Sequence, residues 1–203
     1  EGIVIQEADL RALASGTTTD KIFDTVRRIR QKTDVPLAFM TYINPVFAYG
    51  VDKFMKNAAD CGIDALIVPD MPFEEREELL PACKKYDMTL IYLVAPTSRE
   101  RAQAIAGESD GFVYCVSSLG VTGVRSEITT NIKEMVDTVK QGRDVPCAIG
   151  FGISTPEQAG RMASQADGVI VGSAIVKMVA RYGINCVEPV CDYVKQMTAA
   201  VGV

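Results

Sequence analysis

Short apolar runs rich in β-branched residues recur along the chain, and each is followed by a loop and a longer amphipathic stretch. This alternation limits the fold more than any other feature, because strands that alternate with helices predict an α/β fold with a parallel sheet. The runs are apolar at almost every position, as expected for parallel strands that are buried on both faces. The predicted strands are 37–43, 65–68, 89–94, 111–116, 146–149 and 168–171.

Helices are predicted between and around these strands from apolar residues at helical spacing. Thr155, Pro156 and Gln158 give the clearest helix start, with a capping Thr, a Pro in the first turn and a Gln three residues after the Thr. Two helices, 3–15 and 19–32, precede the first strand. The others are predicted at 51–61, 73–86, 98–106, 131–141, 156–163, 174–181 and 186–198.

The alternation alone fits either a doubly wound sheet or a TIM (β/α)8 barrel. A closed barrel takes about 250 residues and eight strands, whereas this sequence has 203 residues and six predicted strands. We expect a TIM barrel of which about six of the eight strands lie in this sequence, with the first two strands and the helix between them missing. An open six-stranded sheet is the alternative. No linker or shift in composition divides the chain, so residues 1–203 are predicted to be a single, N-terminally incomplete (β/α) barrel domain.

Composition excludes several classes of function. A net charge of −5 argues against nucleic-acid binding, and no apolar run approaches the roughly 20 residues that span a bilayer. The six scattered cysteines, without a C-x-x-C pair, are predicted to be buried thiols of a cytoplasmic protein. Histidine is absent, which removes the usual general base and the commonest metal ligand. We therefore expect no metal site, and acid–base chemistry that depends on other side chains.

Two glycine-containing loops follow the last two predicted strands and are candidates for phosphate binding. Gly150 and Gly152 follow strand 146–149, and Gly172 and Ser173 follow strand 168–171 and open a helix. Glycine allows the backbone to approach a ligand closely, and the first N–H groups of a helix attract an anion. Glycines after strands are often only tight turns, but barrels recurrently bind phosphate with the loops after their last two strands. The pair of loops therefore predicts a phosphate site.

The other candidate residues lie at the same predicted ends of strands. The long connection 117–127 is interpreted as a lid over the substrate, with an ordinary surface loop as the alternative. Asp70 follows a strand and can act as a base or cap the next helix, and capping is the commoner role. Tyr42 ends the first strand, and Tyr114 lines the barrel interior or packs in the core.

An ordered set of motifs covers essentially the whole chain in one register and resembles the α subunit of tryptophan synthase. Each motif alone is weak, whereas the set is specific. The motifs are Val4-Ile5-Gln6-Glu7-Ala8, Leu10-Arg11-Ala12, Gly120-Val121-Thr122-Gly123, Gly150-Phe151-Gly152-Ile153-Ser154 and Gly172-Ser173-Ala174-Ile175-Val176.

The resemblance implies a lyase of tryptophan biosynthesis that cleaves indole-3-glycerol phosphate to indole and glyceraldehyde 3-phosphate by a retro-aldol reaction. It implies no metal or cofactor in the α subunit, and a β subunit that carries pyridoxal phosphate in an α2β2 heterotetramer. Tyr114 corresponds to a tyrosine beside the substrate, Thr122 to a lid threonine, and Met40 and Tyr42 to the wall near the indole. Asp70 corresponds to an acidic residue near the rim. The positions implied to hold the phosphate are Gly123, Phe151, Gly152, Gly172 and Ser173.

The family's two catalytic acids have no match in this sequence. The family places a Glu at the end of its second strand and an Asp in the following loop, and Glu1 and Glu7 match neither. Because the reaction needs acids to move protons, the 203 residues alone are predicted to be inactive. The alternatives are another phosphate-binding barrel enzyme of sugar-phosphate or aromatic amino-acid metabolism, and an inactive truncated barrel that acts only as a binding module.

Overall fold

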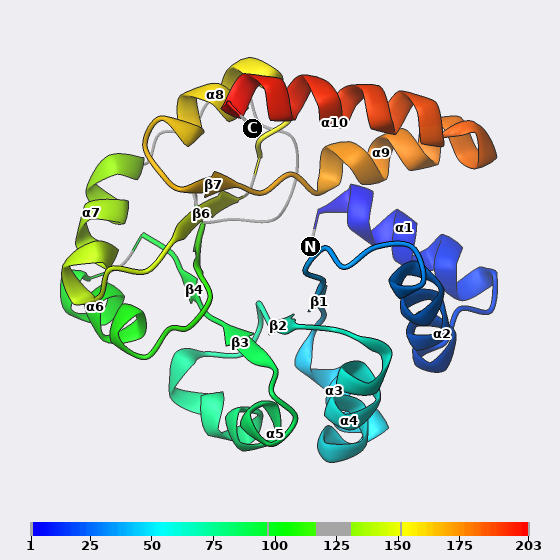
Figure 1. Ribbon diagram of the computed structural model, residues 1–203, viewed down its shortest axis with the longest axis horizontal. Helices are drawn as coiled ribbons and strands as arrows, with labels where there is room; N and C mark the ends of the chain where they lie inside the picture. The colour runs from blue at the N-terminus through cyan, green and yellow to red at the C-terminus, as the bar shows by residue number, and fades with distance from the viewer. Residues whose placement is uncertain (1, 97, 117–130, 151, 203) are drawn as a thin grey trace. The chain divides into compact units, whose positions relative to one another are not determined.

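The computed structural model describes residues 2–96, 98–116, 131–150 and 152–202, and Figure 1 shows them as a ribbon. The chain forms two compact units. The first comprises residues 1–12, 93–108 and 112–203, and the second comprises residues 13–92 and 109–111. The single-domain organisation stays a prediction.

The second unit is built on a three-stranded parallel sheet of order β1-β2-β3. In register, Ala38 faces Ala65, and Ala65 faces Thr89. Phe23 lies at the centre of an aromatic cluster with Phe39, Tyr49 and Phe54, with ring centroids 5.5–5.9 Å from its own. The elements are α2 (Thr19–Arg30), β1 (Ala38–Met40), α3 (Ile43–Tyr49), α4 (Val51–Cys61), β2 (Ala65–Ile67), the 3-10 helix η1 (Phe73–Glu78), α5 (Leu80–Lys85) and β3 (Thr89–Ile91).

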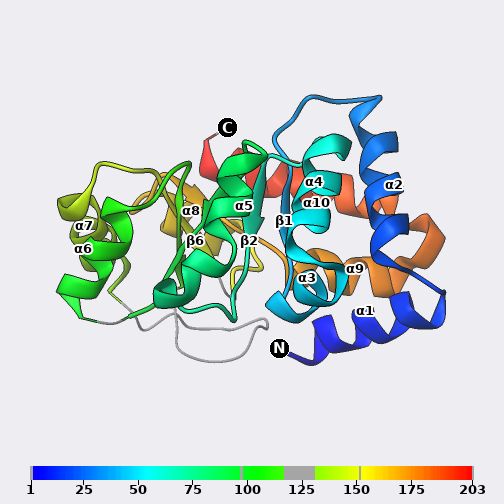
Figure 2. The same cartoon turned by 90° about the horizontal axis from the view of Figure 1, so that it is seen from below.

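The first unit is built on a four-stranded parallel sheet of order β4-β5-β6-β7. Helix α6 packs against α7, and α8 packs against α10 (Figures 1 and 2). Helix α1 (Ile3–Ala14) begins in this unit and ends in the other. The remaining elements are β4 (Leu93–Val94), α6 (Arg99–Gly107), β5 (Val113–Val116), α7 (Ile132–Gly142), β6 (Cys147–Gly150), α8 (Pro156–Ala163), β7 (Gly168–Val169), α9 (Ser173–Tyr182), the 3-10 helix η2 (Gly183–Asn185) and α10 (Val187–Val201).

Local sequence signals explain where several helices begin and end. The hydroxyl oxygens of Thr18 and Thr155 accept hydrogen bonds from the first turns of α2 and α8, and α8 has the complete capping box predicted for it. Gly62 ends α4 with a φ of +97°, a left-handed conformation that favours glycine. The predicted bounds of α4 and α8 are confirmed.

Three expectations about the elements were wrong. The predicted helix 73–86 is divided into η1 and α5, since Pro81 lacks the N–H that would continue the helical hydrogen bonds. Predicted strand 89–94 is interrupted at Tyr92, where the segment changes its hydrogen-bonding partner from β2 to β5. Helix α3 was not predicted, because part of its sequence was assigned to the preceding strand.

The strands are not all buried on both faces. The central strands β2, β5 and β6 are largely buried, as predicted, but Ala38 and Met40 of β1 are exposed and both residues of β7 are only half-buried. In the part of the chain that the structure describes, β1 and β7 are end strands of their sheets.

The cysteines only partly follow the prediction of buried thiols. Cys61, Cys83, Cys115 and Cys147 are buried free thiols, and burial raises the pKa of Cys83 to about 11. A thiol with so high a pKa is a weak nucleophile at neutral pH, which agrees with a structural role. Cys186, the N-cap of α10, is half-buried, and Cys191 within α10 is exposed. No helix among the described residues has the length and hydropathy that crossing a bilayer requires.

Candidate functional site

The two glycine loops follow neighbouring strands of one sheet. Strands β6 and β7 pair in parallel, with Ala148 facing Gly168, and the Ile170 N–H donates to the Ile149 carbonyl oxygen at 2.7 Å. Parallel neighbours end at the same edge of a sheet. The loop that begins after Gly150 and the turn at Gly172 therefore leave the sheet at a shared edge, as the sequence predicted.

The loop after β6 has a backbone that favours glycine and a dense set of hydrogen bonds. Gly152 has a φ of +88°, which side chains with a Cβ rarely adopt. The Gln158 side-chain oxygen accepts hydrogen bonds from the Ser154 N–H at 2.8 Å and the Thr155 N–H at 3.2 Å. The Tyr193 hydroxyl donates to the Ser154 carbonyl oxygen at 2.9 Å. These contacts hold the loop from two helices.

The turn after β7 leads directly into a helix. Gly172 is the N-cap of α9, and its carbonyl oxygen accepts from the N–H groups of Ile175 and Val176. Among the residues that the structure describes, nothing lies within 4 Å of a Cβ built on Gly172. Open space in front of a helix start, where the first N–H groups have no partner within the helix, is a geometry that accommodates an anion. Ser173, the first residue of α9, is half-buried beside it.

Tyr114 lies on β5, the strand that pairs with β6. It is 5% exposed, and its ring stands directly against Gly150 of the neighbouring strand β6, so closely that a Cβ there would overlap the ring. Burial raises the pKa of Tyr114 to about 12, so its hydroxyl keeps its proton at neutral pH. Lining the barrel interior and packing in the core both place Tyr114 among buried residues, so its role stays a prediction.

The remaining predicted residues are not all brought to this edge by the described structure. Tyr42 is 39% exposed and belongs to the second unit, as does Met40, which is 51% exposed. Thr122, Gly123 and Phe151 lie outside the described residues, and so does the whole of the predicted lid 117–127. The predicted site residues that the structure describes in the first unit are therefore Tyr114, Gly152, Gly172 and Ser173.

Asp70 caps a helix, but not the one expected. Its two carboxylate oxygens lie 3.1 and 3.3 Å from the Ile43 nitrogen and accept its N–H at the start of α3. The sequence left open a base and a cap on the following helix, of which capping was the commoner role. The difference arises because β1 and β2 pair in parallel, which places the residues after each strand at a common edge.

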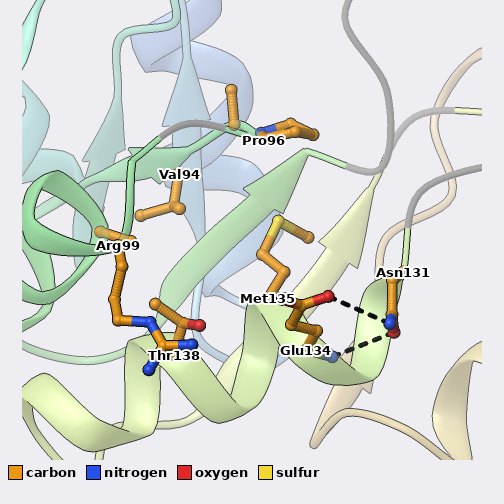
Figure 3. A pocket seen from close by; sticks show the side chains of 9 residues that line it. Val94, Pro96, Arg99, Asn131, Glu134, Met135 and Thr138 are labelled. Carbon is orange, nitrogen blue, oxygen red and sulfur yellow. Dashed lines mark hydrogen bonds between the residues drawn. The ribbon is translucent and has the colours of Figure 1, made fainter.

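A pocket of about 470 Å³ opens beside the first turns of α6 and α7, and the sequence did not predict it (Figure 3). Asn131 caps α7 there and exchanges hydrogen bonds with Glu134. The lining includes none of the predicted site residues. It is formed by Val94, Ala95, Pro96, Arg99, Ala102, Asn131, Glu134, Met135 and Thr138.

Two further residues at the glycine loops escaped prediction as site residues. Gln158 is 7% exposed, and its sequence signal, the capping box, indicated only a helix start. Tyr193 is an isolated tyrosine on α10 and carries no motif. The part of the chain that the structure describes contains no group of three or more Cys, Asp or Glu side chains placed to hold a metal ion.

Comparison with known proteins gives a consistent result. Residues 1–201 match the family model described as tryptophan synthase alpha chain. The tryptophan synthase alpha chain of Lacticaseibacillus casei is 47% identical over 201 residues, which cover 99% of this chain and 76% of the relative.

Solved structures align over nearly the whole chain. A structure from Aquifex aeolicus aligns with a TM-score of 0.89 and 36% identity, over 98% of this chain and 76% of that one. A structure described as the tryptophan synthase a2b2 complex of Pyrococcus furiosus aligns with a TM-score of 0.87 and 32% identity, over 98% and 81%. The fold class is therefore that of these proteins, the TIM barrel, and the chain belongs to the tryptophan synthase alpha chain family.

Proposed function

We propose that this protein performs the lyase reaction of its family, the retro-aldol cleavage of indole-3-glycerol phosphate to indole and glyceraldehyde 3-phosphate. The observation that carries the proposal is the shared edge of β6 and β7, where Gly152 with its positive φ and the open helix start at Gly172 and Ser173 follow adjacent strands. Backbone N–H groups at such an edge suit a phosphate dianion.

The remaining side chains receive their roles from the family resemblance. Gly123 and Phe151 complete the phosphate site, Thr122 lies in a lid that closes over the substrate, and Tyr42 and Tyr114 line the substrate cavity. The protonated hydroxyl and the buried position of Tyr114 support a packing and positioning role for it, since a phenol with a pKa of about 12 does not act as a base at neutral pH.

A partner subunit is part of the proposal. The Pyrococcus furiosus relative is described as an a2b2 complex, and we expect the same heterotetramer here, with pyridoxal phosphate confined to the β subunit. The lyase step itself needs neither metal nor cofactor, because phosphate binding and proton transfer supply its chemistry. We further propose that the protein is cytoplasmic. We also propose that it forms one (β/α) barrel domain.

A second question is whether the 203 residues by themselves cleave the substrate. None of their acidic residues matches the Glu and Asp that the family uses, and we propose that this stretch by itself does not cleave the substrate. A mass measurement paired with a lyase assay tests this directly. Cleavage by a purified protein of 22.0 kDa would contradict it, whereas cleavage only by a protein of greater mass would support it.

A substrate panel tests the function. The complete protein is assayed on indole-3-glycerol phosphate and on sugar phosphates that other phosphate-binding barrels convert. We expect release of indole from the first and no reaction with the others. Activity on a different phosphate ester, with none on indole-3-glycerol phosphate, would instead favour another enzyme of sugar-phosphate or aromatic amino-acid metabolism.

A further inference from the structure

We propose that Gln158 and Tyr193 are positioning residues that hold the loop after β6 in the shape required to bind phosphate. The inference rests on the phosphate site proposed above. It adds to that site two side chains that belong to helices behind the loop, α8 and α10.

Gln158 fixes the loop from α8. Its side-chain oxygen accepts hydrogen bonds from the Ser154 N–H at 2.8 Å, from the Ser154 hydroxyl at 3.1 Å and from the Thr155 N–H at 3.2 Å. The side chain is nearly completely buried, and a buried acceptor is costly to leave without its donors. The loop therefore cannot move away from Gln158 without losing several hydrogen bonds at once.

Tyr193 holds Ser154, the loop residue that Gln158 also contacts, from α10. Its hydroxyl donates to the Ser154 carbonyl oxygen at 2.9 Å, across 39 residues of sequence. Helices α8 and α10 lie side by side (Figure 1), and they approach closely at Gly160, where a Cβ would lie 2.9 Å from the Ala200 carbonyl oxygen. This close packing keeps the tyrosine within reach of the loop.

The two contacts together set the orientation of the backbone at Ser154. Its N–H and its carbonyl oxygen are both engaged, so the peptide groups on either side are fixed, two residues after Gly152 with its positive φ. A loop that is already ordered loses less conformational entropy when an anion binds. Loss of either contact should weaken phosphate binding while leaving the rest of the substrate's contacts intact.

The test compares phosphate affinity in single variants of the complete protein. Tyr193→Phe removes only the hydroxyl, and Gln158→Met removes the acceptor at nearly constant volume. Tyr86→Phe is the matched control, because the Tyr86 hydroxyl also makes one hydrogen bond, to Asp52 at 3.0 Å, in the other compact unit. Inorganic phosphate is titrated calorimetrically, kcat and KM are measured with indole-3-glycerol phosphate, and urea unfolding confirms that each variant folds.

We expect the Kd for phosphate to rise about fivefold in Tyr193→Phe, the value of roughly one hydrogen bond, and more in Gln158→Met. The KM should rise in parallel with little change in kcat, since binding is lost equally in ground and transition states, and Tyr86→Phe should bind like the wild type. Unchanged phosphate affinity in both loop variants, with a wild type that binds phosphate, would overturn this inference alone. A wild type that neither binds phosphate nor cleaves the substrate would overturn the proposed function as well.

Discussion

At the scale of single residues, the Tyr114 ring lies directly against Gly150 of the neighbouring strand β6. The ring occupies the space where a Cβ of residue 150 would stand. Residue 150 must therefore be glycine because no space is left for a Cβ. Residue 152 favours glycine because its backbone has a positive φ. Two glycines of one motif thus serve two different physical needs.

Gly150→Ala should destabilise the protein by about 1–3 kcal/mol or more, since the added methyl group must displace a buried ring. Gly172→Ala is the matched control. In the part of the chain that the structure describes, no atom lies within 4 Å of a Cβ at position 172, and the φ of −118° suits any residue, so a change within about 0.5 kcal/mol is expected. Urea unfolding measures both, and equal losses in the two variants would contradict the role assigned to the ring.

The pKa of Tyr114 predicts a loss of stability in alkali. Burial raises the pKa from 10.0 to about 12 in the folded protein, so the unfolded chain releases this proton first as the pH rises. The free energy of unfolding should fall between pH 10 and 12, by at most about 3 kcal/mol from this group. The free energy of unfolding, measured near pH 8 and near pH 11, should fall less with rising pH in Tyr114→Phe than in the wild type. The same loss in both proteins would refute the assignment.

Sequence identified the residues whose backbone is special and missed those that act through a long-range contact. Gly152 and Gly172 stand in recognisable loops. Tyr193 and Asp70, by contrast, form hydrogen bonds with residues that lie 39 and 27 positions away in the sequence. No local pattern encodes such a pairing, because it depends on which strands and helices become neighbours.

At the scale of elements, Asp167 joins a helix to two strands. Its carboxylate accepts the Cys147 N–H at the start of β6 at 2.8 Å, and it pairs with Lys140 of α7 at 2.9 Å, just before β7 begins. Burial opposes its ionisation, but these donors outweigh burial and hold the pKa of Asp167 below its usual value. The ionised carboxylate therefore stabilises the joint.

Asp167→Asn should lower the free energy of unfolding by about 1 kcal/mol at neutral pH, a modest value because the side chain is 42% exposed. A depressed pKa adds stability above the unfolded value near 3.8 that is lost as the pH falls through the folded value. The difference between variant and wild type should shrink below that pH. Asp137→Asn, which breaks only an exposed i,i+4 pair with Lys133, should have almost no effect, and a similar loss there would contradict the claim.

Periodicity predicted the existence and type of most elements but not their interruptions. Helices α4 and α8 have the predicted bounds, because Gly62 and the capping box at Thr155 mark an end and a start. The break between η1 and α5 and the exposure of β1 were not predicted. The break follows from Pro81, a local signal that the helical periodicity outweighed. The exposure of β1 depends on how neighbouring elements cover the strand, which a one-dimensional pattern does not record.

At the scale of the whole molecule, family membership and the edge chemistry agree. The match runs over residues 1–201, and the loops that the sequence marked as phosphate-binding follow adjacent strands of one sheet. The parallel α/β architecture was predictable because buried strands alternate with helices. The arrangement of Tyr42 with the phosphate loops is implied by the family resemblance alone, and it stays a prediction.

The most direct test of the account is the effect of Gly172→Asp on the cleavage of indole-3-glycerol phosphate by the complete protein. A Cβ at position 172 meets no described residue within 4 Å, so the protein should fold, while the negative charge of the Asp should repel the phosphate at the start of α9. Gly172→Asn, of the same shape without the charge, is the control. We predict that Gly172→Asp abolishes cleavage and that Gly172→Asn retains more activity. Undiminished turnover in Gly172→Asp would contradict the assignment of the phosphate site.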